Sequence, residues 1–360
     1  MRKVLYFGNF DFVNGFAACN RAIGNAVCFS KLGYETYIFG TGFEGFSQTE
    51  FANLHHIHCI AKPFENKLKN YIQCDCYIEC VKKINPTVVV FYNLPSIPFL
   101  KIMLYCRKHH IKIISDVTEW YSTKGVRLCL KPIKWLDTHL RMKYLNKKCD
   151  CLIVISTYLK NYYRDVKNKI MVYPVMDYVR WEAEKFGYYR TEEKRSDVSL
   201  IGKGVLAKDD TEFLKHLLLS LGKKRFNIIG INKESFEKKA KFKCPPNVFF
   251  YPKLNREGVL KIYSRTAWNY VVRKPNKSNM AGFPSKFAES MILGVPVIYN
   301  DFSDLAILKQ KYLFGVDKND DFDVDRLLPI SDDVKEMFIS DFYTKEFRKL
   351  LSEAALSFDE

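Results

Sequence analysis

The chain has 360 residues, 48% of them hydrophobic, and this suits two domains of about 150 to 200 residues better than a single one. Lysine and arginine total 57 against 40 acidic residues, a formal net charge of +17 that favours an acidic partner such as nucleic acid, an anionic membrane surface or phosphorylated ligands. The eleven cysteines are odd in number and scattered, which is typical of reduced core residues in a cytosolic protein and argues against a disulfide framework.

Several kinds of segment and site are not expected. The start MRKVLYFGNFDF lacks the apolar core of a signal peptide, and prolines and a lysine break the apolar stretch 88–106, which fits a strand, a turn and a helix better than a membrane span. Three histidines and a cysteine at 55–59 have no second pair of ligands, so zinc is not expected. The acidic run 317–325 has Phe322 and Leu328 where a calcium loop needs glycine and glutamate, so we expect an acidic surface loop.

The first half of the chain alternates buried strands with helices, which predicts a doubly wound parallel sheet. The opening strand at 4–7 leads through a loop to a helix at 16–32 and a strand at 36–39. Gly8 and Gly15 alone do not make a dinucleotide fingerprint, but Gly15, just before the helix, allows another molecule to approach the backbone. Later strands are expected at 57–61, 87–92, 112–116, 151–156 and 170–173, with helices near 70–83, 97–108 and 158–163.

Asp116 ends one of these predicted strands, in the run IISDVTEWY. Ligands of open α/β sheets bind at the carboxyl ends of the strands, so Asp116 is a candidate for chemistry. Capping of the following turn is the alternative.

The stretch 121–148 is the most basic part of the chain, with eight cations against the single acid Asp137. Ile133, Leu136, Leu140 and Tyr144 fall on one helical face, so part of this stretch is an amphipathic basic helix. One interpretation is an ordinary surface helix packed on its own domain. The other is docking of 124–148 on anionic lipid headgroups, which suits a lipid-linked acceptor.

The charged segment 178–197 is interpreted as a linker, after which a second strand and helix series begins. A strand at 197–201 runs into Gly202, and Lys208 follows just before Asp209 and Asp210, which are good N-caps for a helix at 211–221. A glycine turn with a lysine before a helix is a plausible diphosphate site or a plain surface turn. Further strands are expected at 226–230, 248–251 and 268–272, and Arg273 at the end of the last is placed to reach the same phosphates.

The stretch 282–300, GFPSKFAESMILGVPVIYN, predicts a loop, a helix, a tight turn and a buried strand. The amides around Ser285 and Lys286 open the helix, where the dipole and a nearby lysine favour a phosphate. Glu289 lies about one turn further and is placed to accept hydrogen bonds from hydroxyls beside that phosphate. A helix cap and a glutamate that complements the dipole are the alternative interpretation.

This stretch resembles the signature of retaining glycosyltransferases of the GT-B fold, especially family 4, which carries a segment of the type G-F-P-S-K-x-x-E-x-x-x-x-G-x-P-V-I. The resemblance implies that Glu289 holds the ribose of a nucleotide sugar, that the preceding amides hold its diphosphate, and that Lys208 contacts the same diphosphate. A weaker similarity covers 150–177. The family often has a second glutamate eight residues before the first, where this chain has Ala281.

The resemblance implies two Rossmann-like domains facing across a cleft: an acceptor domain at 1–180, a nucleotide-sugar domain at 181–340, and a helical tail at 341–360 that packs back on the first domain. It implies transfer of a sugar from a nucleotide-diphosphate sugar to a glycan or lipid-linked acceptor, with retention of configuration and with neither metal nor cofactor. We expect a cytoplasmic enzyme of bacterial-type surface polysaccharide or glycan assembly, peripheral at the inner face of the membrane. The alternatives are an epimerase of the same fold and a non-catalytic interaction protein. A nucleic-acid partner is not expected, because no recognised zinc finger or RNP motif is present.

Overall fold

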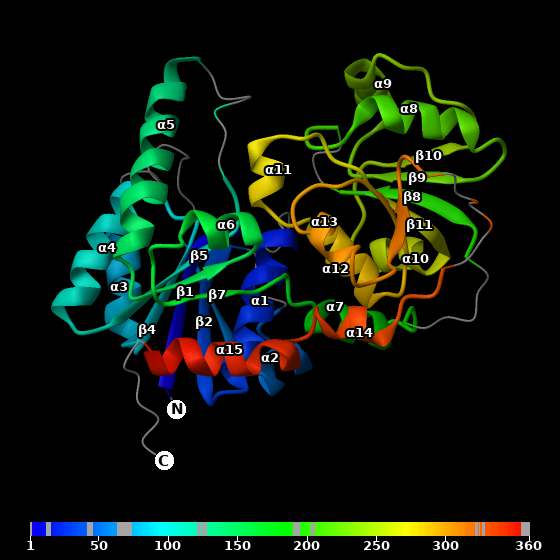
Figure 1. Cartoon of the computed structure of the whole chain (residues 1–360). Coiled ribbons are helices and arrows are strands. Elements are labelled where there is room, and N and C mark those ends of the chain that lie inside the picture. Colours follow the sequence, from blue (N-terminus) through cyan, green and yellow to red (C-terminus); the bar gives the residue numbers. More distant parts are fainter. Residues whose placement is uncertain are drawn as a thin grey trace. The chain divides into compact units, whose positions relative to one another are not determined.

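The computed structural model describes residues 2–11, 16–41, 46–62, 74–120, 123, 128–189, 195–202, 206–320, 323, 325 and 328–353. The chain divides into two compact units, coloured by sequence in Figure 1. Unit 1 comprises Met1–Val175 and Ser340–Glu360, and unit 2 comprises Met176–Ile339.

Unit 1 is built on a seven-stranded sheet in the order β3-β2-β1-β4-β5-β6-β7, in which all neighbouring strands are parallel. The strands are β1 (Arg2–Asp11), β2 (Tyr34–Thr41), β3 (Ile57–Ala61), β4 (Val88–Tyr92), β5 (Lys112–Val117), β6 (Cys151–Val154) and β7 (Lys169–Met171). The helices are α1 (Phe16–Ser30), α2 (Glu50–Leu54), α3 (Asp75–Ile84), α4 (Ser96–Lys108), α5 (Lys131–Leu140), α6 (Thr157–Tyr162) and α15 (Ser340–Glu353), with short helical turns at Leu128–Leu130, Arg141–Leu145 and Asn146–Lys148.

The central strands of unit 1 are near-continuous apolar runs, as expected for a parallel sheet covered on both faces. Residues 88–91 of β4 and all of β6 are buried. Gly24 allows α1 to approach the end of the sheet closely, since a Cβ atom there would lie 2.4 Å from the carbonyl oxygen of Val175. This contact fixes α1 against the chain that follows β7.

The C-terminal helix α15 completes unit 1. Phe347 is fully buried and meets Phe29 of α1 edge to face, with ring centroids 5.1 Å apart. The backbone N–H of Tyr173 donates to Tyr343 Oη at 3.1 Å, which ties α15 to the chain after β7. Unit 1 is therefore assembled from the two ends of the chain.

Unit 2 is built on a six-stranded parallel sheet in the order β10-β9-β8-β11-β12-β13. The strands are β8 (Asp197–Ile201), β9 (Phe226–Ile229), β10 (Val248–Tyr251), β11 (Thr266–Val271), β12 (Val297–Tyr299) and β13 (Gly315–Asp317). The helices are α7 (Asp177–Lys185), α8 (Thr211–Ser220), α9 (Lys233–Ala240), α10 (Arg256–Arg265), α11 (Lys277–Ala281), α12 (Ser285–Ile292), α13 (Leu305–Leu308) and α14 (Asp332–Glu336).

The core of unit 2 gathers leucines of α8 and apolar residues of β8, β9 and β11 around Trp268, which is 2% exposed. Asp210 caps α8 through a hydrogen bond from the amide of Phe213, which confirms its prediction as an N-cap. In both units the pattern of strands and helices agrees with the predicted doubly wound α/β class.

Two expectations about local structure need correction. The segment 178–197 is not an irregular linker, because α7 occupies its first part and buries Val179, Glu182 and Ala183. The predicted helix near 70–83 begins at Asp75, and residues 70–73 lie outside the described residues. The charge of α7 hid its short buried stripe from a search for apolar periodicity.

Candidate functional site

At the carboxyl edge of the unit 2 sheet, Lys208 and Arg273 are brought to adjacent segments. The amide of Lys274 donates to the carbonyl of Lys208 at 3.0 Å, and Arg273 pairs with Asp209 at 2.7 Å. Asn300 at the end of β12 holds the backbone of Arg273 from both sides, accepting from its N–H at 2.8 Å and donating to its C=O at 3.0 Å. The strand ends thus fix two cationic residues at one place, as strand-end chemistry predicts.

Helix α12 contributes Ser285, Lys286 and Glu289. Its N-cap is Pro284, which supplies no side-chain hydrogen bond to the first turn. The amide of Phe287 already donates to the carbonyl of Pro284 at 2.9 Å, so the amides of Ser285 and Lys286 are the ones that suit an anion, which the helix dipole also favours. Gly294, in the left-handed region at φ +66°, ends the helix and turns the chain toward β12.

Helix α11 links the two groups of residues. Asn279 donates to the carbonyl of Lys208 at 3.1 Å and to that of Lys274 at 2.8 Å. The chain then passes through Gly282 directly into α12. The Lys208–Arg273 corner and the start of α12 are therefore parts of one connected substructure within unit 2.

Glu289 lies in a buried ionic network and is only 1% exposed. Its carboxylate accepts from Lys286 Nζ at 2.7 Å and from Tyr263 Oη at 3.4 Å, and lies 3.8 Å from Arg256 of α10. Arg256 in turn donates to Glu182 of α7 at 2.6 Å. A ligand hydroxyl reaching Glu289 would join or replace these donors.

The network shifts the pKa values of its two glutamates in opposite directions. Burial opposes ionisation of Glu289, but Lys286 and Arg256 outweigh it and hold its pKa below the ordinary value. Burial raises the pKa of Glu182 despite Arg256, and the charge on Glu289 adds to that rise. Glu289 is therefore the carboxylate that the fold keeps ionised, which suits an acceptor of hydrogen bonds.

The remaining donor-site predictions fall in different places. Gly202 follows β8 at the same edge of the sheet and is partly exposed, with open space where a Cβ atom would stand. Gly15 lies outside the described residues. A cavity of about 220 Å³ in unit 2 is lined by residues such as Asp197, Arg225 and Lys261, near the start of β8, and contains none of the predicted site residues.

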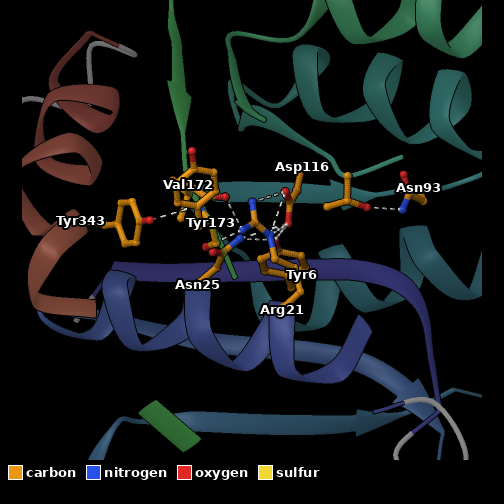
Figure 2. Close-up of polar contacts among 9 residues, drawn as sticks. Tyr6, Arg21, Asn25, Asn93, Asp116, Val172, Tyr173 and Tyr343 are labelled. Carbon is orange, nitrogen blue, oxygen red and sulfur yellow. Dashed lines mark hydrogen bonds and ion pairs between the residues drawn. The ribbon is translucent and has the colours of Figure 1, made fainter. Parts of the chain in front are cut away.

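In unit 1, Asp116 is the centre of a buried polar cluster (Figure 2). It is fully buried and pairs with Arg21 of α1 at 2.9 Å. Tyr6 Oη donates to its other oxygen at 2.5 Å, and Asn25 Nδ2 donates to the same atom at 3.0 Å. Burial, and after it the charge of Asp116, raises the pKa of Tyr6 well above its ordinary value, so Tyr6 remains a donor.

The Asp116 cluster joins four elements. Arg21 also donates to the carbonyls of Val172 and Tyr173, at 2.7 and 3.0 Å, so one guanidinium ties α1 and β5 to the chain after β7 (Figure 2). Both carboxylate oxygens of Asp116 are already engaged by Arg21, Tyr6 and Asn25. A catalytic role for Asp116 stays a prediction, and the geometry adds a positioning role.

The sequence did not single out the partners of the predicted residues. Arg256, Glu182 and Tyr263 come from α7 and α10, and Asn279 and Asn300 hold backbone groups. Asn300 ends the stretch 282–300, and the other four lie outside any recognised motif. Arg256 and Tyr263 are seven residues apart in α10, and this spacing alone indicates that they lie on the same side of one helix.

Comparison with solved structures places the fold. Sucrose-phosphate synthase from Thermosynechococcus elongatus superposes with a TM-score of 0.59 at 14% identity, covering 99% of this chain and 91% of that one. HepE from Anabaena in complex with UDP-glucose gives 0.57 at 11% identity, covering 99% and 93%. The chain has the GT-B fold. The structure of a putative UDP-N-acetylglucosamine 2-epimerase from Listeria monocytogenes also matches. Its TM-score is 0.52 at 11% identity, and the match covers 98% of this chain and 90% of that one.

Comparison of the sequence with family models and with curated proteins finds no match. Within the described ranges, no three His, Cys, Asp or Glu residues gather as a metal-binding group. Across the same part of the chain, no helix combines the length and the apolar character needed to cross a bilayer.

Proposed function

We propose that this GT-B protein is a glycosyltransferase that takes a sugar from a nucleotide-diphosphate donor, and that unit 2 binds the donor. The observation that carries the proposal is the single substructure in which Lys208, Arg273 and the uncapped start of α12 are joined through α11. Lys208, Arg273 and a helix N-terminus together suit a diphosphate, which would share Arg273 with its partner Asp209. The solved structure of HepE with UDP-glucose gives support at the level of the fold.

Each donor-site residue has a distinct role in this proposal. Lys208 and Arg273, with the amides at Ser285 and Lys286, neutralise the diphosphate, while Gly202 leaves room for it. Glu289, kept ionised by its network, accepts from the ribose hydroxyls. As the anomeric bond breaks, negative charge grows on the leaving diphosphate, so cations already in place lower the barrier.

We further propose that unit 1 receives the acceptor, a glycan or a lipid-linked glycan, in surface polysaccharide or glycan assembly. The Asp116 cluster ties Tyr6 in the middle of β1 and Asp116 near the end of β5 to α1, which supports this part of the sheet. Retention of configuration and independence of metal are part of the proposal and come from the resemblance of 282–300. The proposed location is the cytoplasmic face of a membrane, met through 124–148, and the eleven free thiols suit a reducing compartment.

Titration of UDP, GDP and ADP sugars against the purified protein tests donor binding and names the base. We expect Lys208→Ala to weaken binding roughly tenfold to a hundredfold, because a charge-assisted contact to phosphate contributes about 1.5 to 3 kcal/mol. Lys238→Ala, an exposed lysine of α9, is the matched control and should bind as the parent does. Equal affinity in Lys208→Ala and the parent would refute the donor site, and absence of any nucleotide binding would favour a non-catalytic interaction protein.

An epimerase is the second candidate, because the Listeria monocytogenes protein shares the fold. An epimerase converts the donor alone, without an acceptor. Incubation of the donor sugar with the protein, followed by analysis of the sugar released by mild acid, separates the two reactions: a new epimer formed without acceptor would replace the transferase proposal.

A further inference from the structure

Helix α5 has its polar side buried and its apolar side exposed. The buried residues of α5 are Asp137 and Thr138. By contrast, Ile133 is 57% exposed, Trp135 58% and Leu136 50%. This is the reverse of an ordinary surface helix, whose apolar stripe packs on its own domain.

The buried polar side of α5 attaches it to the start of α4. Asp137 Oδ1 accepts from the amide of Ser96 at 2.6 Å. In the turn that follows α5, Arg141 donates to the carbonyls of Asn93 and Leu94, at 3.0 and 3.1 Å. Because these contacts are specific and buried, the outward direction of the apolar side is set by the fold. Figure 1 shows α5 extending away from the sheet of unit 1.

Helix α4 adds a second apolar stripe to the same region. Ile97, Leu100 and Leu104 fall three and four residues apart on one side of α4 and are 42% to 55% exposed. We name the combined surface the α4–α5 face. It consists of Ile97, Leu100, Leu104, Leu128, Leu130, Ile133, Trp135, Leu136, Leu140 and Tyr144, all of them exposed.

Positive charge accompanies this apolar surface. The two helices and the turns after α5 carry Lys101, Arg107, Lys108, Lys131, Lys134, Lys143, Lys147 and Lys148. Of the acids nearby, Asp137 is buried and Asp165 pairs with Lys147 at 2.5 Å. An occupant of the α4–α5 face should therefore combine apolar and anionic groups.

We propose that the α4–α5 face binds the surface of an anionic lipid bilayer. Trp135, Tyr144 and the leucines enter the boundary between headgroups and acyl chains, while the lysines meet lipid phosphates. This deepens the proposed function, on which it rests for its purpose, by naming the surface on which unit 1 would meet a lipid-linked acceptor. The binding itself requires no nucleotide sugar and is tested without one.

Flotation with lipid vesicles tests the proposal. The full-length protein is expected to float with vesicles of phosphatidylcholine containing 30% phosphatidylglycerol, at least tenfold more strongly than with phosphatidylcholine alone. Trp135 fluorescence should shift to shorter wavelength on binding, and Trp135→Phe should remove that shift. Equal binding to both kinds of vesicle, or to neither, overturns the proposal.

Paired variants distinguish vesicle binding by the α4–α5 face from nonspecific binding by other exposed apolar residues. The double variant Ile133→Ser and Leu136→Ser should reduce vesicle binding at least tenfold, as should Lys143→Glu with Lys148→Glu. Leu219→Ser with Leu313→Ser removes two leucines of unit 2 that are 64% and 67% exposed, and should bind as the parent does. All these positions are exposed, so folding should persist, and circular dichroism checks it.

A second copy of this chain is the competing occupant of the α4–α5 face. If the parent sediments as a dimer that Ile133→Ser with Leu136→Ser converts to a monomer, and anionic vesicles bind neither form, the face is an interface between two copies and the lipid proposal fails. Nucleotide-sugar titration of the same variants distinguishes this from failure of the donor site, because unit 2 is unchanged in them.

Discussion

The guanidinium of Arg256 lies between Glu182 and Glu289, whose pKa values shift in opposite directions. It donates to Glu182 at 2.6 Å and lies 3.8 Å from Glu289, which also has Lys286 as a partner. A buried ion pair contributes little net stability when complete but costs much when one partner is removed. The network therefore fixes where α7, α10 and α12 meet and keeps Glu289 charged at the same time.

The opposite pKa shifts of the two glutamates predict opposite pH dependences. The pKa of Glu289 lies below its ordinary 4.5 in the fold, so its ionised form stabilises the protein above about pH 4.5, and this contribution is lost as the pH falls through the folded value. Glu289→Gln should therefore cost most at pH 7, about 3 kcal/mol or more, and less in acid. Urea unfolding at a series of pH values measures this.

Glu182→Gln is the matched variant in the same network. Burial raises the pKa of Glu182 above 4.5, so folding favours its protonated form more than unfolding does, and the carboxyl group contributes stability below about pH 4.5 that is lost as the pH rises through the folded value. The loss caused by Glu182→Gln should shrink toward neutral pH. If both variants lose stability in the same direction with pH, the electrostatic account of the network is wrong.

The sequence indicates which residues of unit 2 are candidates for a donor site, but it does not indicate their contacts. Helix spacing predicts that Lys286 and Glu289 lie together, because positions three apart share a face. Their burial and their link to Arg256 depend on α10 crossing near α12, which spacing within one element cannot show. Asp116 was likewise placed at a strand end, but its partners Arg21 and Tyr6 stand 95 and 110 residues away in the sequence.

At the scale of elements, α15 is the part of the tail that stabilises unit 1. Phe347→Ala should destabilise unit 1 by about 3 to 5 kcal/mol, because it removes a fully buried ring from its contact with Phe29. Hydrogen exchange should show the loss of protection in α1 and in α15. Phe342 on the same helix is 52% exposed, and Phe342→Ala should leave exchange nearly unchanged. Comparable losses in both variants would contradict the packing described.

Element types followed from periodicity, whereas the environment of an element did not. The helical face at Ile133, Leu136, Leu140 and Tyr144 was expected either to pack on its own domain or to dock on lipid, and all four side chains are exposed. The pattern is the same in both cases, since it records only that the residues share a face. The deciding contacts, from Asp137 to Ser96 and from Arg141 to Asn93, come from residues that looked like ordinary surface charges.

At the scale of the whole molecule, the eleven cysteines are all free thiols, and Cys129 is the exposed one. Burial raises the pKa of Cys59 and Cys106 to about 12, so these thiols are unreactive at pH 8. We expect a thiol reagent such as DTNB to modify Cys129 rapidly and the others slowly, with all eleven reacting in denaturant without reductant. Cys129→Ser should remove the fast phase and Cys244→Ser should keep it. A fast phase that survives in Cys129→Ser would contradict the burial pattern.

The return of α15 to unit 1 sets an order of events during translation. All of unit 2 is synthesised before α15. Until then, Phe29 of α1 cannot pack against Phe347, although the strands of both sheets have already been synthesised. The part of α1 around Phe29 therefore stays uncovered until α15 has been synthesised. A chaperone that acts near the ribosome would bind the nascent chain at this part of α1.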